Sequence, residues 1–122
     1  MELQNKRKKG KYAEDIAKNF LLNKGYDIIS QNYFKRYGEI DIIAREKEVI
    51  VFVEVKSLYS EGFIEINETI SKLKRMRLIN LANMWIWEYY KRNNIEFRID
   101  FLGIVFEGSK IKRILHLENS IY

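Results

Sequence analysis

Two carboxylates and an amine occur within a short stretch whose other residues are mostly apolar. The stretch is GEIDIIAREKEVIVFVEVK, residues 38–56, and it contains Asp41, Glu54 and Lys56. Carboxylates gathered on a partly buried surface repel one another, and burying their charge is costly unless a cation lies between them. Mg²⁺ prefers oxygen ligands and commonly takes only one or two protein carboxylates. The stretch therefore predicts a site for Mg²⁺, with Mn²⁺ as the alternative ion.

A β-hairpin would bring these groups onto one face of a sheet. The two segments that flank the polar tip REKE have the pattern of strands. If Ala44 pairs with Val49, Asp41 and Glu54 become diagonal neighbours with backbones about 7 Å apart, close enough to share one ion. A slip of one residue would send Asp41 to the other face. Glu39 then faces Glu54, and both a structural hydrogen-bonding role and a site role are open for it.

Each residue of the predicted site has an expected role. Asp41 and Glu54 would bind the metal together with a backbone carbonyl such as that of Val55. Lys56 would position or activate a water and stabilise negative charge on a phosphoryl oxygen. Glu14 lies on the flank of the apolar face of the first helix and could lean into the site. An acid and a lysine two residues apart on a strand more often form a solvated ion pair, but the additional acids and the buried strand favour the metal site.

The periodicity of apolar residues predicts one α/β domain over residues 1–122, with the element order α-β-β-β-α-β-β. Residues 1–9 are expected to be a mobile basic lead-in before a first helix that begins near residue 11 and ends near Gly25, a good C-cap. A long second helix is expected from the N-cap Asn67 to about residue 92.

Strands are expected over residues 26–30, 39–44, 49–55, 97–106 and 111–117, with a polar connection over 31–38. The segment 49–55 is apolar at almost every position, which suits a strand that is covered on both faces. It should therefore be central in a mixed sheet flanked by the two helices.

The motifs together resemble a known superfamily. A helix carrying Glu14, then Gly-Glu-Ile-Asp at 38–41 and Val-Phe-Val-Glu-Val-Lys at 51–56, resembles the PD-(D/E)xK nucleases, which include restriction endonucleases and archaeal Holliday-junction resolvases. Nearly the whole chain is also similar to the small, uncharacterised bacterial YraN-like family. Ile40 stands where the superfamily name has proline, a departure that the superfamily tolerates.

The resemblance implies a restriction-endonuclease-like fold and a Mg²⁺-dependent endonuclease that cuts DNA, including branched or recombination and repair DNA. It implies Asp41 and Glu54 as metal ligands, Lys56 as the catalytic lysine and Glu14 as an auxiliary acid. Resolvase-like nucleases that cut paired strands often act as dimers, so a homodimer is an open alternative. Two rival functions are a nucleic-acid-binding module without catalysis and a scaffold whose basic helix binds an acidic protein.

The charge balance agrees with a polyanionic partner. The formal net charge is +5, and each lysine or arginine that neutralises a phosphate releases condensed counterions. Lys74 and Arg77 fall inside the apolar stripe of the second helix, whereas Lys72 and Arg75 face away. The inner pair could meet the site carboxylates, a DNA phosphate or water, and phosphate contact is the favoured role.

Several other kinds of site are disfavoured. The chain has no cysteine, which excludes disulfides and thiolate metal sites, and it has one histidine, His116. A single histidine makes a poor zinc site, so a structural or surface role is expected. Aromatic residues of the second helix are expected in the core or at a dimer contact rather than stacked on bases; they are Trp85, Trp87, Tyr89 and Tyr90. No apolar stretch reaches about 18 residues and the N-terminus has no apolar leader, so a cytoplasmic protein without a membrane partner is expected.

Overall fold

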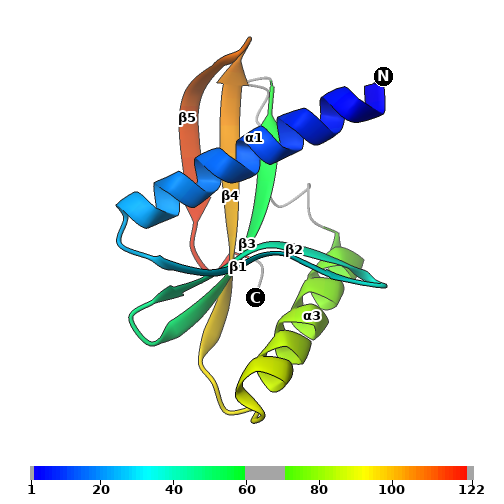
Figure 1. Cartoon of the computed structure of the whole chain (residues 1–122), viewed down its shortest axis with the longest axis vertical. Coiled ribbons are helices and arrows are strands. Elements are labelled where there is room, and N and C mark those ends of the chain that lie inside the picture. Colours follow the sequence, from blue (N-terminus) through cyan, green and yellow to red (C-terminus); the bar gives the residue numbers. More distant parts are fainter. Residues whose placement is uncertain (1, 60–70, 121–122) are drawn as a thin grey trace.

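A five-stranded sheet lies between two helices in the computed structural model, which describes residues 2–59 and 71–120 (Figure 1). The elements in chain order are α1 (Glu2–Asn23), β1 (Asp27–Lys35), β2 (Gly38–Glu46), β3 (Val49–Leu58), α3 (Lys72–Tyr90), β4 (Phe97–Glu107) and β5 (Lys110–Leu117). This order confirms the predicted α/β fold. None of the helices in the described ranges is both long and apolar enough to cross a membrane.

The sheet has the order β1-β2-β3-β4-β5, so β3 is its central strand. Strands β3 and β4 are parallel, and the other neighbours are antiparallel. Parallel neighbours need a crossover connection, and α3 lies within it. Ile50 and Phe52 pack on the α3 face, while Val51 and Val53 pack on the α1 face. The continuous apolar run in β3 is thus explained, as predicted, by two covered faces.

Several predicted boundaries were wrong. Helix α1 begins at Glu2, so residues 2–9 belong to the helix rather than to a lead-in before it; this segment is rich in lysine and arginine, which favour helices. Strand β1 continues to Lys35, because its pairing with β2 extends to Lys35 and Gly38 through the expected connection.

The second helix also has other ends than expected. Ser71 is the N-cap of α3, and its Oγ accepts a hydrogen bond from the Lys74 N–H at 3.1 Å. The expected cap Asn67 lies outside the described residues. The helix ends at Tyr90, and Lys91 follows with a left-handed φ of 59°, a conformation typical of a helix C-terminus.

The register of the β2–β3 hairpin differs from the prediction by two residues. Ala44 pairs with Val51 rather than Val49, because the strands continue through the polar tip to the pair Glu46 and Val49. A shift of two keeps every side chain on its face. The described pairs end at Ile42 and Val53, and one further step would set Asp41 directly opposite Glu54 instead of diagonal to it.

Strand β2 twists sharply at Asp41. Ile42 packs in the core on the α1 face, whereas Ile40, two residues earlier, packs in the core on the α3 face. Residues two apart share a face in a regular strand, so the strand must rotate between them. The neighbouring strand has a left-handed residue at this level, Asn32 with φ 54°, between the pairs of Ile42 and Ile40. In Figure 1 the far end of the β1–β2 pair accordingly extends toward α3.

A buried polar network fixes β4 to β5. The Asp100 side chain is fully buried and accepts hydrogen bonds from Arg98 Nε at 3.0 Å and from the Asn119 N–H at 2.8 Å. His116 Nε2 lies 2.8 Å from the second Asp100 oxygen, and Lys24 Nζ lies 2.8 Å from His116 Nδ1. An ammonium group only donates, so His116 Nδ1 accepts a hydrogen bond from Lys24, and the Nε2–H group donates one to Asp100. His116 therefore has a structural role here, as expected.

The Asp100 network should contribute strongly to stability. Burial would raise the pKa of Asp100, but hydrogen bonds from His116, Asn119 and Arg98 outweigh it and lower that pKa. We expect Asp100→Asn to reduce the free energy of unfolding by about 3–5 kcal/mol, because a buried network loses its charge and gains an unmatched donor. Urea denaturation at neutral pH measures this.

The control is Asp27→Asn, which removes an exposed ion pair to Arg45 with an N···O distance of 3.6 Å. It should change stability by less than about 1 kcal/mol. Equal losses in the two variants would show that the buried network has no special weight.

Candidate metal and active site

The Asp41 carboxylate lies where β2 separates from β3. Its Oδ2 accepts a hydrogen bond from the Val55 N–H at 2.8 Å. The described backbone pairing of the two strands stops just before this level, at Ile42 and Val53. A side-chain oxygen thus takes the place of a main-chain acceptor, and it fixes Asp41 against the central strand.

Three carboxylates converge at this point. Glu14, Glu39 and Asp41 each offer an oxygen, and these oxygens all lie within 4.8 Å of one another. Glu14 comes from α1 and the other two from β2, so the cluster joins the helix to the hairpin. In the amide orientation that satisfies both groups, Asn32 Nδ2 lies 2.9 Å from Glu14 Oε1. The left-handed residue that accompanies the twist of β2 therefore also holds one of the acids.

Burial and mutual repulsion raise the pKa values of two acids in the cluster. Burial and the Glu54 charge, with smaller contributions from Glu14 and Glu39, raise the pKa of Asp41 to about 8, although the Val55 N–H acts in the opposite direction. The pKa of Glu14 is also raised, first by burial and then by the charge of Glu39. Burial and neighbouring negative charges both disfavour the ionised form of a carboxyl group, and such raised pKa values are common at functional sites.

Glu54 lies beside this cluster and has a cationic partner of its own. Lys74 Nζ from α3 lies 2.8 Å from Glu54 Oε1, and the Glu54 side chain is only 10% exposed. Of the three partners left open for Lys74, the site carboxylate is therefore the one seen. Glu54 is not one of the three acids whose oxygens converge. After burial, however, its charge is the main cause of the raised pKa of Asp41.

The helical-wheel prediction was only partly right. Lys74 is partly buried as expected, but Arg77 is exposed and Arg75 is partly buried. The reason is that α3 is covered incompletely near Arg77, where the β1–β2 turn leaves a hollow between itself and the helix. Lys72 is exposed, as predicted.

Lys56 is exposed at the end of the same face of β3 as Glu54. Within the described part of the chain no ion pair holds its ammonium group. Lys56 is therefore accessible to an anionic ligand. Val55 meets the site through its N–H; the expected contribution of its carbonyl stays a prediction.

Two hollows meet at Glu39. The first has a volume of about 470 Å³ and lies between α1 and β1, with Lys11 and Glu14 in its wall. The second has a volume of about 290 Å³ and lies between the β1–β2 turn and α3, with Lys74 and Arg77 in its wall. Because Glu39 lines both, the surface is concave on either side of this carboxylate, with Lys11 in one hollow and Lys74 and Arg77 in the other. This shape and charge suit an extended anionic ligand.

The sequence predicted Asp41, Glu54, Lys56 and Glu14 as site residues, and these roles stay predictions; it left the role of Glu39 open and gave Asn32 no role. Both residues enter the site because β2 and β1 bend at the same level. The available signal was a polar side chain in each strand at the position where the hairpin approaches the first helix.

Comparisons with known proteins place the chain among relatives of similar length. The family model described as "Uncharacterised protein family UPF0102" matches residues 13–104. A UPF0102 protein of Natranaerobius thermophilus is 40% identical over 118 residues, which cover 95% of this chain and 98% of the relative. A UPF0102 protein of Sulfurihydrogenibium sp. is 41% identical, covering 94% and 95%, and one of Vibrio parahaemolyticus is 36% identical, covering 93% and 94%. The predicted membership in an uncharacterised bacterial family is confirmed, and the nuclease superfamily stays a prediction.

The raised pKa of Asp41 should make stability depend on pH in the absence of metal. A carboxyl group whose pKa is raised on folding stabilises the protein below its unfolded pKa, and this contribution is lost as pH rises toward about 8. In EDTA, the wild-type melting temperature should therefore fall between pH 5 and pH 8.5 by at least about 4 °C more than that of Asp41→Asn, which corresponds to about 1 kcal/mol. Glu107→Gln, an exposed acid at the end of β4 and away from the cluster, is the control and should follow the wild type. A wild-type profile that coincides with that of Asp41→Asn would show that the carboxylates do not repel.

Proposed function

The chain belongs to the uncharacterised protein family UPF0102, and we propose that it is a metal-dependent endonuclease that hydrolyses phosphodiester bonds in DNA. One observation carries this proposal. Three carboxylates from two elements converge within 4.8 Å, the pKa of one is raised to about 8, and basic side chains flank them. Among the described residues, none of these three acids is in an ion pair with a lysine or an arginine, whereas the neighbouring Glu54 pairs with Lys74.

The donor set fits a hard divalent cation. Carboxylate oxygens are the ligands that Mg²⁺ and Mn²⁺ prefer, and the polar hollow beside them leaves room for the waters that Mg²⁺ retains. Asp41, Glu14 and Glu39 would hold the ion, with Glu54 next to them. When bound, the ion would polarise a phosphoryl oxygen and lower the pKa of a bound water. Asp41 is held in position by the Val55 N–H, and Glu14 by Asn32.

The basic residues would act on the phosphate. The ammonium group of Lys56 would orient the attacking water or stabilise the negative charge that grows on the phosphoryl oxygens. Lys74 now pairs with Glu54; a phosphate entering the hollow would offer it a second anion, and Arg77 lines the same wall. Glu54, once released from Lys74, would then be available to bind the metal.

A nucleic-acid-binding module without catalysis is the second candidate. The Lys74–Glu54 ion pair at 2.8 Å favours it, because a site carboxylate that is already neutralised has less need of a metal. Both candidates require the basic surface, but only the nuclease requires the acids and Lys56. For either candidate, a homodimer and a preference for branched or repair DNA are part of the proposal.

Lys56→Ala should lower the cleavage rate by about 10²–10³-fold, the loss typical of one preorganised group that stabilises transition-state charge. DNA affinity and the melting temperature should change little, because Lys56 is exposed. The assay follows labelled linear and branched DNA in Mg²⁺, Mn²⁺ or EDTA. Lys110→Ala, an exposed lysine at the start of β5, is the control and should cut like the wild type. If Lys56→Ala cuts at the wild-type rate, Lys56 has no part in the reaction; if wild type cuts nothing in any metal, the binding module is favoured.

Lys74→Ala combined with Arg77→Ala should weaken DNA binding and flatten its salt dependence. Each lost duplex phosphate contact should reduce the slope of log affinity against log salt by about 0.9. Titrations in EDTA from low to high salt measure binding without cleavage. The control is Lys72→Ala combined with Arg92→Ala, which removes the same amount of charge. Lys72 is the first residue of α3, Arg92 lies two residues after its end, and both are exposed. Equal slopes for the two double variants would refute a specific role of the hollow.

A further inference from the structure

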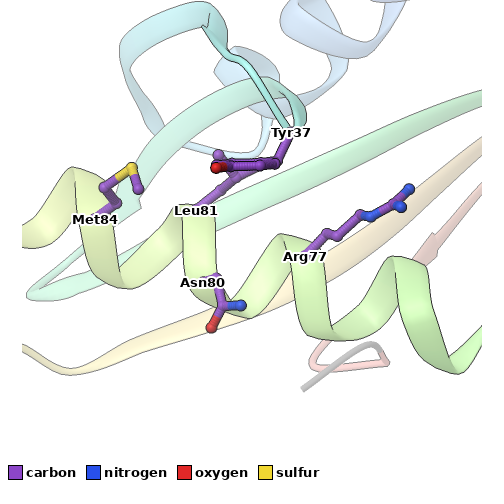
Figure 2. Close-up of a pocket in the computed structure, with 5 residues that line it drawn as sticks. All are labelled: Tyr37, Arg77, Asn80, Leu81 and Met84. Carbon is purple, nitrogen blue, oxygen red and sulfur yellow. The ribbon is translucent and has the colours of Figure 1, made fainter.

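A groove beside the proposed active site is lined by an exposed aromatic ring. Tyr37 projects from the β1–β2 turn toward α3, and Figure 2 shows Leu81 directed at its ring, with Met84 on one side and Arg77 on the other. The groove has a volume of about 240 Å³. That is below the roughly 300–1,000 Å³ of pockets that hold whole drug-sized ligands. It would therefore take one ring system of a larger ligand.

The walls of the groove have the chemistry that binds a nucleobase. Tyr37 is 65% exposed, and an exposed aromatic face stacks on any base because every base has a π-face. Leu81 closes the inner side, and the thioether of Met84 is polarisable and adapts its shape. Asn80 also lines the groove, but its amide points away from the Tyr37 ring in Figure 2, so the stacking side chains carry the recognition.

The groove is continuous with the active site. The hollow that contains Glu39 and Lys74 also includes Tyr37, Arg77 and Leu81, which are three of the five residues that line the groove. A base on Tyr37 would therefore have its own phosphate at Arg77 and Lys74, on the path to the carboxylates. Neither a free aromatic metabolite nor a peptide explains why an apolar groove, two cations and a metal-type acid cluster follow one another in this order.

Resting on the nuclease function proposed above, we propose that this groove is a subsite for one unpaired nucleobase, so that the substrate is a nucleic acid with an unpaired nucleotide next to the cleaved phosphate. A base in a duplex has both faces covered by its neighbours and cannot reach a side chain that stacks on it. Bulges, flaps and junction strands supply such a base at little cost, because it is already unstacked or unpaired. A fully paired duplex does not.

The test measures binding in EDTA, where cleavage cannot interfere. The probes are a fully paired DNA duplex and the same duplex with one unpaired 2-aminopurine, whose fluorescence falls when it stacks. The wild type should bind the second probe about tenfold more tightly, the gain expected from one stacked base, and quench its fluorescence. Tyr37→Leu should lose both effects and retain the affinity for the paired duplex, whereas Tyr37→Phe should keep both, since it retains the ring.

Tyr89→Leu is the matched control, because Tyr89 is exposed to a similar degree, 56%, but does not line the groove. It should behave as the wild type. Equal affinity of the wild type for the two probes, or a preference that survives in Tyr37→Leu, would overturn the subsite. If either of these outcomes is found in a protein that still cuts paired DNA, the subsite is refuted but the nuclease function is not. A preference that needs Tyr37 in a protein that cuts nothing would support the subsite on a binding module instead.

Discussion

The hydrogen bond from the Val55 N–H to Asp41 Oδ2 is the contact on which the site depends. It replaces a rung of the β-sheet with a side chain, and so lets β2 leave β3 without exposing an unpaired main-chain donor in a partly buried place. Because β2 can leave, Glu39 and the β1–β2 turn reach the space between the two helices. The Asp41 carboxylate is then close to Glu14 and Glu54, and burial together with their charges raises the pKa of Asp41 to about 8. This bond thus holds Asp41 where burial and the charges of its neighbours act on it.

The rest of the molecule provides the stability that such a cluster needs. The sheet is covered on both faces, and Phe52 and Val53 of the central strand are almost fully buried on opposite sides. On the α1 face, near the other end of the cluster's helix, Asp100 is surrounded by donors and its pKa is lowered. The two acidic positions therefore have opposite environments. The charge of Asp100 is compensated by its donors, whereas Asp41 is buried among like charges.

Local pattern was enough to predict the elements, the central strand and most acids of the site. The apolar run of β3, and the acid and the lysine at its end, can be recognised from the sequence of that segment alone. The register was not, because Arg45 and Glu46 look like turn residues but extend the strands by pairing with Asp27 and Arg98 across the sheet. The twist at Asp41 depends on a left-handed Asn32 in another strand, and the exposure of Arg77 depends on where the β1–β2 turn comes to lie. Such relations between distant segments have no signature within one segment.

Strand β5 is at one edge of the sheet, and its first residues include Lys110, Lys112 and Arg113, all exposed. An edge strand offers a row of main-chain groups to any other strand, and lysine is a common protection against that. Two copies that met along β5 would bring like charges face to face, which is unfavourable for cross-strand neighbours. The basic character that suits a polyanion thus has a second consequence: this edge can stay uncovered and still resist growth of the sheet into an aggregate.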